Sequence, residues 1–399
     1  MSYSVEKFDV NALALQYNDY TVDLRRYFHR NPEPSMKEEG TAKRIREELD
    51  RMGISWFSAT ETGTVGVIEG DGTCPENILA LRADIDALEL TELVEWDHKS
   101  QISGMMHGCG HDAHTAMLLG AARILKDKVK GKFPGTIYLL FQPGEESTLG
   151  AKYVVETGVL DGIKAIYGQH LWSYYDTGKL LTRGGRMMAG AKMFDIYFTG
   201  VGGHGSSLDK CVNPLIPVAV TAMSLQTIVS QNVNAKDIAS LCVGQINGGS
   251  RNNIVPESAH LGGNFRTFSR ETEETVCKRI CQIAEHVSAA YDVKAEVTFS
   301  RSIPSLHTDP ALTKVLEGSL RKVVGEENLV ELPIEMGSED FSEYGVLCPC
   351  VYSFVGCRND EKGCNAGHHS GYFKVDEDSL KYGVAAYVQF VLDYFERDN

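Results

Sequence analysis

A cysteine and a histidine that could bind a metal ion lie two residues apart in segment 107–112, which reads HGCGHD. Cys109 supplies a thiol and His111 an imidazole, and both groups are common ligands of transition-metal ions. The same residues would also fit a free core cysteine beside a surface histidine. On its own, this segment leaves both interpretations open.

Two adjacent carboxylates, Glu145 and Glu146, follow the apolar run 136–140, which is typical of a buried strand. Pro143 and Gly144 break that run, so both acids fall at the carboxyl end of the strand. One carboxylate can bind a metal ion while the other, with a pKa raised by burial, takes a proton from water. The alternative is a solvated acidic turn.

Further histidines follow two more segments. His170 ends the apolar run 165–169, and His368 and His369 lie together in segment 366–373. A single histidine is more often structural than a metal ligand. The joint occurrence of these side chains after strand-like segments favours a metal site.

Together these segments resemble the motifs of the aminoacylase and carboxypeptidase superfamily of two-metal amidohydrolases. The branch that the chain resembles contains N-acyl-amino-acid amidohydrolases, hippurate hydrolase and indoleacetyl-amino-acid hydrolases. The similarity runs along nearly the whole chain, and the motifs occur in the family's order. It includes five further segments: 24–33 (LRRYFHRNPE), 81–88 (LRADIDAL), 202–205 (GGHG), 253–256 (NIVP) and 337–341 (GSEDF).

The resemblance implies two divalent metal ions and a general base. Glu145 would be that base, accepting a proton from water and passing it to the leaving nitrogen. Asp84 and Asp86 would orient the metal ligands, and an ordinary turn at a strand end is the alternative for both. The implied ligands are Cys109, which would bridge the two ions, His111, Glu146, His170 and His369.

Two details of this ligand set need comment. His369 is preferred to His368 because the family pattern begins there, although Gly371 stands where that pattern usually has proline. A thiolate favours Zn, whereas carboxylate and imidazole ligands also suit Mn, Co or Ni. The sequence therefore does not name the metal.

For three polar residues outside the metal motifs, a functional role is implied only by the resemblance to the family. It implies that His204 reaches into the partner subunit's site and stabilises the oxyanion of the tetrahedral intermediate. It also implies that Asn253 and Arg266 bind the substrate carboxylate. Without the resemblance, His204 would be a histidine of a glycine-rich turn and Arg266 an exposed cation on a strand.

The order of apolar segments predicts an α/β fold. Strands and helices alternate in the first half of the chain, which indicates a central, mostly parallel sheet with helices on both faces. Ligands are expected at the carboxyl ends of its strands. The expected elements are a helix over 38–51 that stops at Gly53, strands over 78–83, 136–141 and 165–170, and a helix over 114–128.

A second, inserted unit is expected over residues 189–304, between the parts 1–188 and 305–399 of the metal-binding catalytic domain. The resemblance implies that this insert is a lid that also forms the dimer interface. Its predicted order is ferredoxin-like: strand 194–198, helix 214–229, strands 238–246 and 258–265, helix 271–290 and strand 295–300.

The composition of the 399-residue chain limits its partners. Its 39 basic and 54 acidic residues give a formal charge of −15, which argues against binding nucleic acid or anionic membranes. No signal peptide or spanning helix is visible near the start, which predicts a cytoplasmic location. The ten cysteines are therefore expected as free thiols. Whether the cluster of Cys348, Cys350, Cys357 and Cys364 binds anything is open.

The sequence thus predicts a homodimeric, metal-dependent hydrolase that cleaves the amide bond of N-acyl amino acids into a carboxylic acid and a free amino acid. A metal-dependent dipeptidase or carboxypeptidase is the alternative within enzymes, because a peptide is also an acylated amino acid. A non-catalytic metabolite-binding protein on the same scaffold is the alternative from another class. Glu145 argues against it, because a binding protein needs no base beside the ligand Glu146. The acyl group, the preferred amino acid and the pathway are not readable from the sequence.

Overall fold

The computed structural model describes residues 8–397, which form two compact units. The first unit extends to Met187 and also contains His307–Pro333 and the chain from Asp340 onward. The second contains Met188–Leu306 and Ile334–Glu339. The sequence indicated a single return to the first unit near residue 305. Instead, a hydrogen bond from the N–H of Ala189 to the carbonyl oxygen of Glu335 (3.0 Å) ties the second short segment to the second unit.

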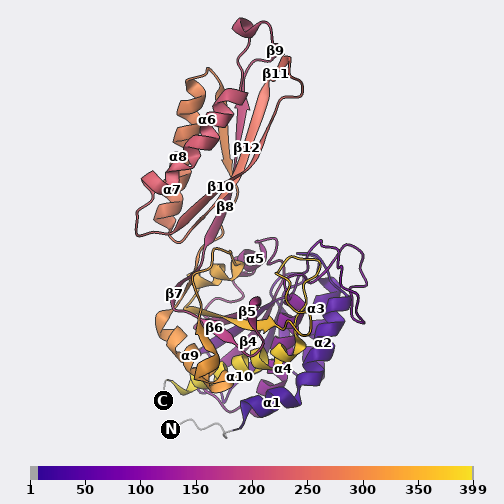
Figure 1. Ribbon diagram of the computed structural model, residues 1–399. Coiled ribbons are helices and arrows are strands. Elements are labelled where there is room, and N and C mark those ends of the chain that lie inside the picture. The colour runs from indigo at the N-terminus through magenta and orange to yellow at the C-terminus, as the bar shows by residue number, and fades with distance from the viewer. Residues whose placement is uncertain (1–7, 398–399) are drawn as a thin grey trace. The chain divides into compact units, whose positions relative to one another are not determined.

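An eight-stranded mixed sheet forms the centre of the first unit (Figure 1). Its strands follow the order β1-β2-β4-β3-β5-β16-β6-β15. β3 pairs in parallel with β4 and β5, and β5 pairs in parallel with β16, so the centre of the sheet is parallel as predicted. The bounds are β1 (Ser55–Ser58), β2 (Thr64–Glu69), β3 (Ile78–Asp84), β4 (Thr136–Gln142), β5 (Ala165–Asp176), β6 (Leu180–Thr182), β15 (Leu329–Glu331) and β16 (Cys350–Arg358).

The central strands are buried because their sequences are apolar on both faces. β3 reads ILALRAD and β4 reads TIYLLFQ, and nearly every residue of both strands is buried. Their parallel direction brings their carboxyl ends to the same edge of the sheet. Asp84, Gln142 and the loop that carries Glu145 therefore start from neighbouring positions.

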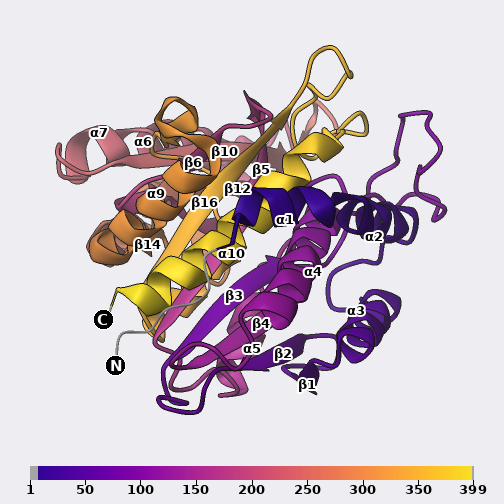
Figure 2. The same cartoon turned by 90° about the horizontal axis from the view of Figure 1, so that it is seen from below.

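Helices pack on both faces of this sheet. Figure 2 shows α1, α4 and α10 together on one face, while α5 contacts β4 from the other. α3 ends at Gly53 as predicted, where a φ of +65° lets the chain leave the helix. The helices are α1 (Val10–Gln16), α2 (Asn18–Arg30), α3 (Glu39–Met52), α4 (His111–Lys128), α5 (Gly150–Glu156), α9 (Pro310–Val324) and α10 (Leu380–Glu396), with short 3₁₀ turns η2 (Glu326–Asn328), η3 (Asp340–Val346) and η4 (Glu377–Ser379).

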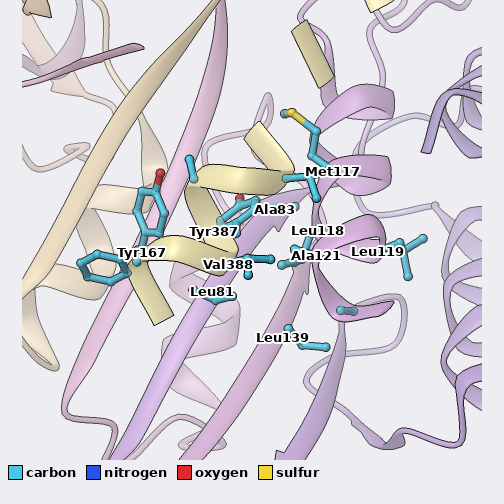
Figure 3. Close-up of a cluster of buried hydrophobic side chains, with 14 of the residues drawn as sticks. Leu81, Ala83, Met117, Leu118, Leu119, Ala121, Leu139, Tyr167, Tyr387 and Val388 are labelled. Atoms are coloured by element: carbon cyan, nitrogen blue, oxygen red, sulfur yellow. The ribbon is translucent and has the colours of Figure 1, made fainter. Parts of the chain in front are cut away.

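The main hydrophobic core joins the sheet to α4 and α10. α4 is buried on almost all sides, because it lies between the sheet and other helices. Burying a large apolar side chain contributes about 1.5–3 kcal/mol, so this core holds the N-terminus of α4 firmly against the strand ends. Figure 3 shows part of the cluster: Leu81, Ala83, Met117, Leu118, Ala121, Leu139, Tyr167, Tyr387 and Val388.

The second unit has a four-stranded antiparallel sheet in the order β10-β12-β8-β13, with helices between the strands in the predicted ferredoxin-like sequence. The predicted helix over 214–229 is divided at Gln226, beside a hydroxyl of Thr227 that donates to the carbonyl oxygen of Ser224 (2.7 Å). The elements are β8 (Gly190–Thr199), α6 (Leu215–Leu225), α7 (Thr227–Asn232), β10 (Ala239–Gly248), β12 (Ser258–Thr267), α8 (Arg270–Ala289) and β13 (Lys294–Phe299).

Shorter elements complete the chain. β7 (Gly185–Met188) and β14 (Leu306–Thr308) lie where the chain passes between the units. In the second unit, β9 (Gly203–His204) pairs with β11 (Ile254–Val255), and η1 (Leu208–Lys210) follows β9. Within residues 8–397, none of the helices has the length and hydrophobicity that crossing a membrane would require.

Candidate active site

The sequence motifs of the first unit meet at the carboxyl-end edge of its central strands. Cys109 lies just before α4, and His111 is the first residue of that helix. Between them, Gly110 adopts a φ of +93°, which favours glycine and turns the chain into the helix. The remaining predicted ligands follow β4, lie within β5 or stand in the loop after β16.

Within residues 8–397, five groups of three side chains are each close enough to hold a metal ion, and two of these groups share Cys109. The possible ligand atoms of Cys109, His111 and His170 lie within 4.8 Å of one another, as do those of Cys109, Glu146 and His369. The Sγ of Cys109 is 3.4 Å from Nε2 of His170, and Nε2 of His369 is 3.3 Å from Oε1 of Glu146. One thiolate shared by two groups is the arrangement that a bridged pair of ions requires.

Buried polar atoms without hydrogen bonds indicate that the cluster suits a cation. Nε2 of His111 is buried without a hydrogen-bond partner within residues 8–397, and Oε1 of Glu146 is buried with only another candidate ligand, Nε2 of His369, nearby (3.3 Å). A buried polar group left without a partner costs about 1–3 kcal/mol. A thiolate, imidazoles and a carboxylate are ligands that suit divalent transition metals, so the residues present fit the two ions.

Two buried aspartates hold the histidines of this cluster in place. Oδ1 of Asp86 lies 3.1 Å from Nδ1 of His111, and Oδ2 of Asp86 accepts hydrogen bonds from Ser35 Oγ (2.6 Å) and from the N–H of Glu146 (3.0 Å). Oδ1 of Asp84 lies 2.6 Å from Nδ1 of a further histidine, His114, which belongs to neither of the groups that contain Cys109. Carboxylates in such positions commonly fix the ring orientation of metal-binding histidines.

Burial and neighbouring charges shift the pKa values in the cluster. Burial alone would lower the pKa of His111, but the charge of Asp84 and the hydrogen bond that His111 donates to Asp86 raise it well above its ordinary value. Hydrogen bonds with Cys109 and Glu146 raise the pKa of His369 to about 10, and burial raises the pKa of the Cys109 thiol. Protons and metal ions compete for these lone pairs, so metal affinity is expected to fall at low pH.

Glu145 lies directly beside the two groups and is largely buried. Its Oε2 is 3.9 Å from Nε2 of His111, and with His111 and Glu146 it forms a further group within 4.8 Å. The turn before it is fixed by Gly144, which has a φ of +65° and whose N–H donates to the buried Glu38 (2.9 Å). The turn therefore presents both carboxylates to one place, as a ligand and an adjacent base require.

The two consecutive histidines near the C-terminus are in different environments. His369 belongs to the second ligand group and has a left-handed φ of +61°, which is unusual for a residue other than glycine. Nε2 of His368 instead accepts a hydrogen bond from the N–H of Ser173 (3.2 Å), and its ring packs on Trp172 (5.0 Å between centroids). Of this pair, only His369 joins the candidate ligands.

Sequence reasoning missed a buried charged network behind Asp84. Arg82 is fully buried and contacts Asp84 (2.7 Å) and Asp340 (3.0 Å). The available signal was an arginine within the apolar strand β3, because a buried charge requires partners. Asp340 lies 258 residues further along the chain, so no local pattern could have named it.

All ten cysteines are free. Cys348, Cys350, Cys357 and Cys364 are buried, and none of them belongs to a group of three close metal-binding side chains in the described part of the chain. Burial raises the pKa of Cys348 and Cys350 to about 12, so both are thiols at neutral pH.

The three predicted lid residues lie in the second unit, at opposite ends of its sheet. His204 and Asn253 are neighbours, because the N–H of Gly205 donates to the carbonyl oxygen of Asn253 (2.8 Å). His204 is part of β9 and Asn253 directly precedes β11, and these two strands lie beyond the end of the sheet where β8 ends and β12 begins (Figure 1). Arg266 is near the other end of the ten-residue β12, where its Nη1 donates to Oδ1 of Asn264 (3.1 Å). At about 3.3 Å per residue, a ten-residue strand separates the two ends by roughly 30 Å.

A comparison with protein families agrees with the geometry of the first unit. The model of peptidase family M20/M25/M40 matches residues 80–393. The chain belongs to this family. As a member, it is a metal-dependent amidohydrolase that uses two divalent metal ions.

Relatives in this family have related activities in their names. IAA-amino acid hydrolase ILR1-like 4 of Arabidopsis thaliana is 38% identical over 99% of this chain and 90% of its own length. N-acetyl-L-cysteine deacetylase of Bacillus subtilis is 37% identical over 90% of this chain and 84% of its own. Thermostable carboxypeptidase 2 of Saccharolobus solfataricus is 34% identical over 95% and 96%, respectively.

Solved structures share the fold over nearly the whole chain. A protein of methicillin-resistant Staphylococcus aureus has a TM-score of 0.89 and 31% identity, covering 97% of this chain and 99% of that one. A dinuclear metal-binding peptidase of the M20 family from Bacillus subtilis has a TM-score of 0.82 and 27% identity, covering 96% and 99%.

Proposed function

We propose that this metal-dependent hydrolase cleaves the amide bond of N-acyl amino acids at the cluster around Cys109, with Glu145 as its general base. The observation that carries the proposal is that two ligand groups share one thiol beside a buried carboxylate that belongs to neither. The proposed ligands are Cys109, His111 and His170 for one ion, and Cys109, Glu146 and His369 for the other.

The residues divide the reaction between them. Bound divalent ions lower the pKa of water from about 16 toward about 7 and polarise the amide carbonyl. Glu145 accepts a proton from the attacking water and delivers it to the leaving nitrogen, which must be protonated before it departs. Asp86 would keep the His111 ring aimed at its ion, whereas Asp84 contacts His114, a histidine outside both ligand groups.

The substrate class is supported by the names of two relatives, an IAA-amino acid hydrolase and an N-acetyl-L-cysteine deacetylase. Both names describe removal of an acyl group from an amino acid. A dipeptidase or carboxypeptidase activity is the second candidate, because a thermostable carboxypeptidase is also similar along the chain. The N-acyl amino acid hydrolase and the peptidase alternative differ in whether the enzyme requires a free α-amino group on its substrate.

In our proposal, the second unit is a lid whose polar residues serve two different sites of a homodimer. The roughly 30 Å between the ends of a ten-residue strand exceeds the length of an N-acyl amino acid. Asn253 and Arg266 of one chain therefore cannot bind the same carboxylate. We assign Arg266 to the site of its own chain, and His204 with Asn253 to the site of the partner subunit.

One edge of the second unit suits the dimer contact. β10 is an edge strand that pairs only with β12 among the described residues, so its other side offers free backbone hydrogen-bonding groups. The neighbouring helix α6 exposes Ile216 and Met223, which lie two turns apart on one side of the helix. Pairing of β10 with its symmetric copy would cover both features. A cytoplasmic location stays a prediction, and the ten free cysteines agree with a reducing compartment.

The proposal is tested by measuring amino-acid release from N-acyl amino acids and from dipeptides. Chelator-stripped protein would be assayed alone and with Zn, Mn, Co or Ni added back separately. We expect release that depends on metal and is faster with N-acetyl and N-arylacyl substrates than with free dipeptides. Release from dipeptides alone would favour the peptidase alternative, and no release with any metal would contradict the proposal.

A further inference from the structure

His114 is a buried histidine that belongs to neither proposed ligand group. It lies on α4 three residues after His111, and its side chain has no exposed surface. Its ring nitrogens have two different partners. Nε2 accepts a hydrogen bond from the N–H of Leu171 (2.8 Å), and Nδ1 lies 2.6 Å from Oδ1 of Asp84.

These partners determine where the ring carries its proton. A backbone N–H can only donate, so Nε2 of His114 must be unprotonated. Asp84 is held as a carboxylate by the buried Arg82, whose Nη1 lies 2.7 Å from Oδ2 of Asp84. A carboxylate can only accept, so Nδ1 of His114 carries the proton and donates it. Nε2 of the ring therefore serves as an acceptor on the side of β5.

Nε2 of His114 accepts its hydrogen bond from a backbone N–H next to a proposed metal ligand, His170. Leu171 follows His170 in β5, three residues beyond Gly168, where the pairing of β5 with β3 ends. The N–H of Leu171 is thus bonded to the His114 ring rather than to a neighbouring strand. The carbonyl oxygen of Leu171 lies 2.5 Å from Nδ1 of His170, which leaves Nε2 of His170 directed toward Cys109 (3.4 Å).

We infer that His114 is a positioning residue for metal binding, which holds the backbone at Leu171 and thereby the orientation of the His170 ring. The buried ion pair of Arg82 and Asp84 holds the His114 ring on its Nδ1 side. The contacts therefore continue from this ion pair through His114 to the proposed ligand His170. The two imidazole rings also touch, with centroids 4.4 Å apart. Because His170 is a proposed ligand, this role rests on the ligand set given under Proposed function.

Two substitutions of His114 distinguish the loss of its acceptor atom from the loss of its ring volume. The amide oxygen of His114→Gln can take the place of Nε2 and still accept from Leu171, whereas the shorter His114→Asn can replace only the Nδ1 contact to Asp84. The control is His29→Asn, which removes another fully buried imidazole bound to a carboxylate, Asp112 (2.8 Å). His170→Ala is included to test the ligand set itself.

The measurement is the number and affinity of bound Co²⁺ ions, obtained by competition with a chromophoric chelator and by the cobalt–thiolate absorption band. Thermal unfolding of each metal-free variant reports its structural cost. We expect His114→Asn to weaken one of the two ions by about 10–100-fold, the usual effect of losing an outer partner of a ligand. His114→Gln and His29→Asn should keep both ions at wild-type affinity.

Three results would overturn the inference. His114→Asn could bind both ions as tightly as the wild type, the Gln and Asn variants could lose metal affinity and thermal stability equally, or His114→Gln could fold normally and still lose an ion. If His114→Asn does not fold, the Gln variant alone decides, because it must keep both ions. If His170→Ala retains both ions at wild-type affinity, the ligand set is wrong rather than the role of His114 alone.

Discussion

The polar residues of the first unit converge, whereas those of the second unit are dispersed. Cys109 and His369 lie near opposite ends of a long stretch of the chain, yet their ligand atoms and that of Glu146 lie within 4.8 Å of one another. His204 and Arg266 are closer in sequence than Cys109 and His369, yet they lie toward opposite ends of a ten-residue strand. The first unit can therefore hold its ions within one chain, whereas in our proposal the polar residues of the second unit serve two different sites.

The largest effect should come from the base in the convergent cluster. Glu145→Gln keeps the size of the side chain but cannot accept a proton, so kcat should fall by about 10²–10⁴-fold. Both metal ions should stay bound, because Glu145 belongs to neither ligand group that contains Cys109. Steady-state kinetics together with metal analysis of the purified variant would check this.

The matched control is the neighbouring residue. Glu146→Gln should lose metal first and activity as a result, and added metal should restore part of its rate. Substantial turnover by metal-loaded Glu145→Gln would mean that another group is the base.

Removing the metal should affect the two units differently. A metal ion stabilises the folded state by about 2.7 kcal/mol when its free concentration is 100 times its Kd. A chelator should therefore destabilise the unit that holds the cluster. Hydrogen exchange should increase in the loops at Cys109, Glu146 and His369, with little change in β8, β12 and β13. Equal loss of protection in both units would contradict a metal site confined to the first.

The smallest effect should come from the dispersed residues. Arg266→Ala should raise KM about tenfold or more for substrates with a free carboxylate, because a hydrogen bond to a charged group contributes about 1.5–3 kcal/mol. Burial lowers the pKa of this guanidinium. Because the ordinary pKa of arginine is very high, the group stays charged at neutral pH.

Two comparisons sharpen this test. Arg266→Lys keeps the charge without the planar fork and should recover only part of the loss. With a carboxamide analogue, the wild type and Arg266→Ala should become alike, and an equal loss on both substrates would rule out the carboxylate role.

The strands and helices that position the cluster were predictable because their signals are local. β3 and β4 are continuous apolar runs bounded by turns, and α3 shows helical periodicity up to Gly53. The break at Gln226 was not predicted, because the apolar pattern continues through it.

The ligand set could be named only through resemblance to a family, since single histidines carry little information. Long-range polar contacts were harder still to predict. Asp340 partners Arg82 across 258 residues, and His114 looked like one more residue of an apolar helix. Its function depends on where the end of β5 lies in space.

The most direct test is to mix two inactive variants, Glu145→Gln and His204→Ala, under conditions that exchange subunits. In a mixed dimer, one site would combine an intact Glu145 with the partner's intact His204. Since half of the dimers formed at random are mixed and each has one complete site, we predict recovery of about a quarter of wild-type activity. No recovery, despite mixed dimers seen by native mass spectrometry, would contradict a site completed by the partner subunit.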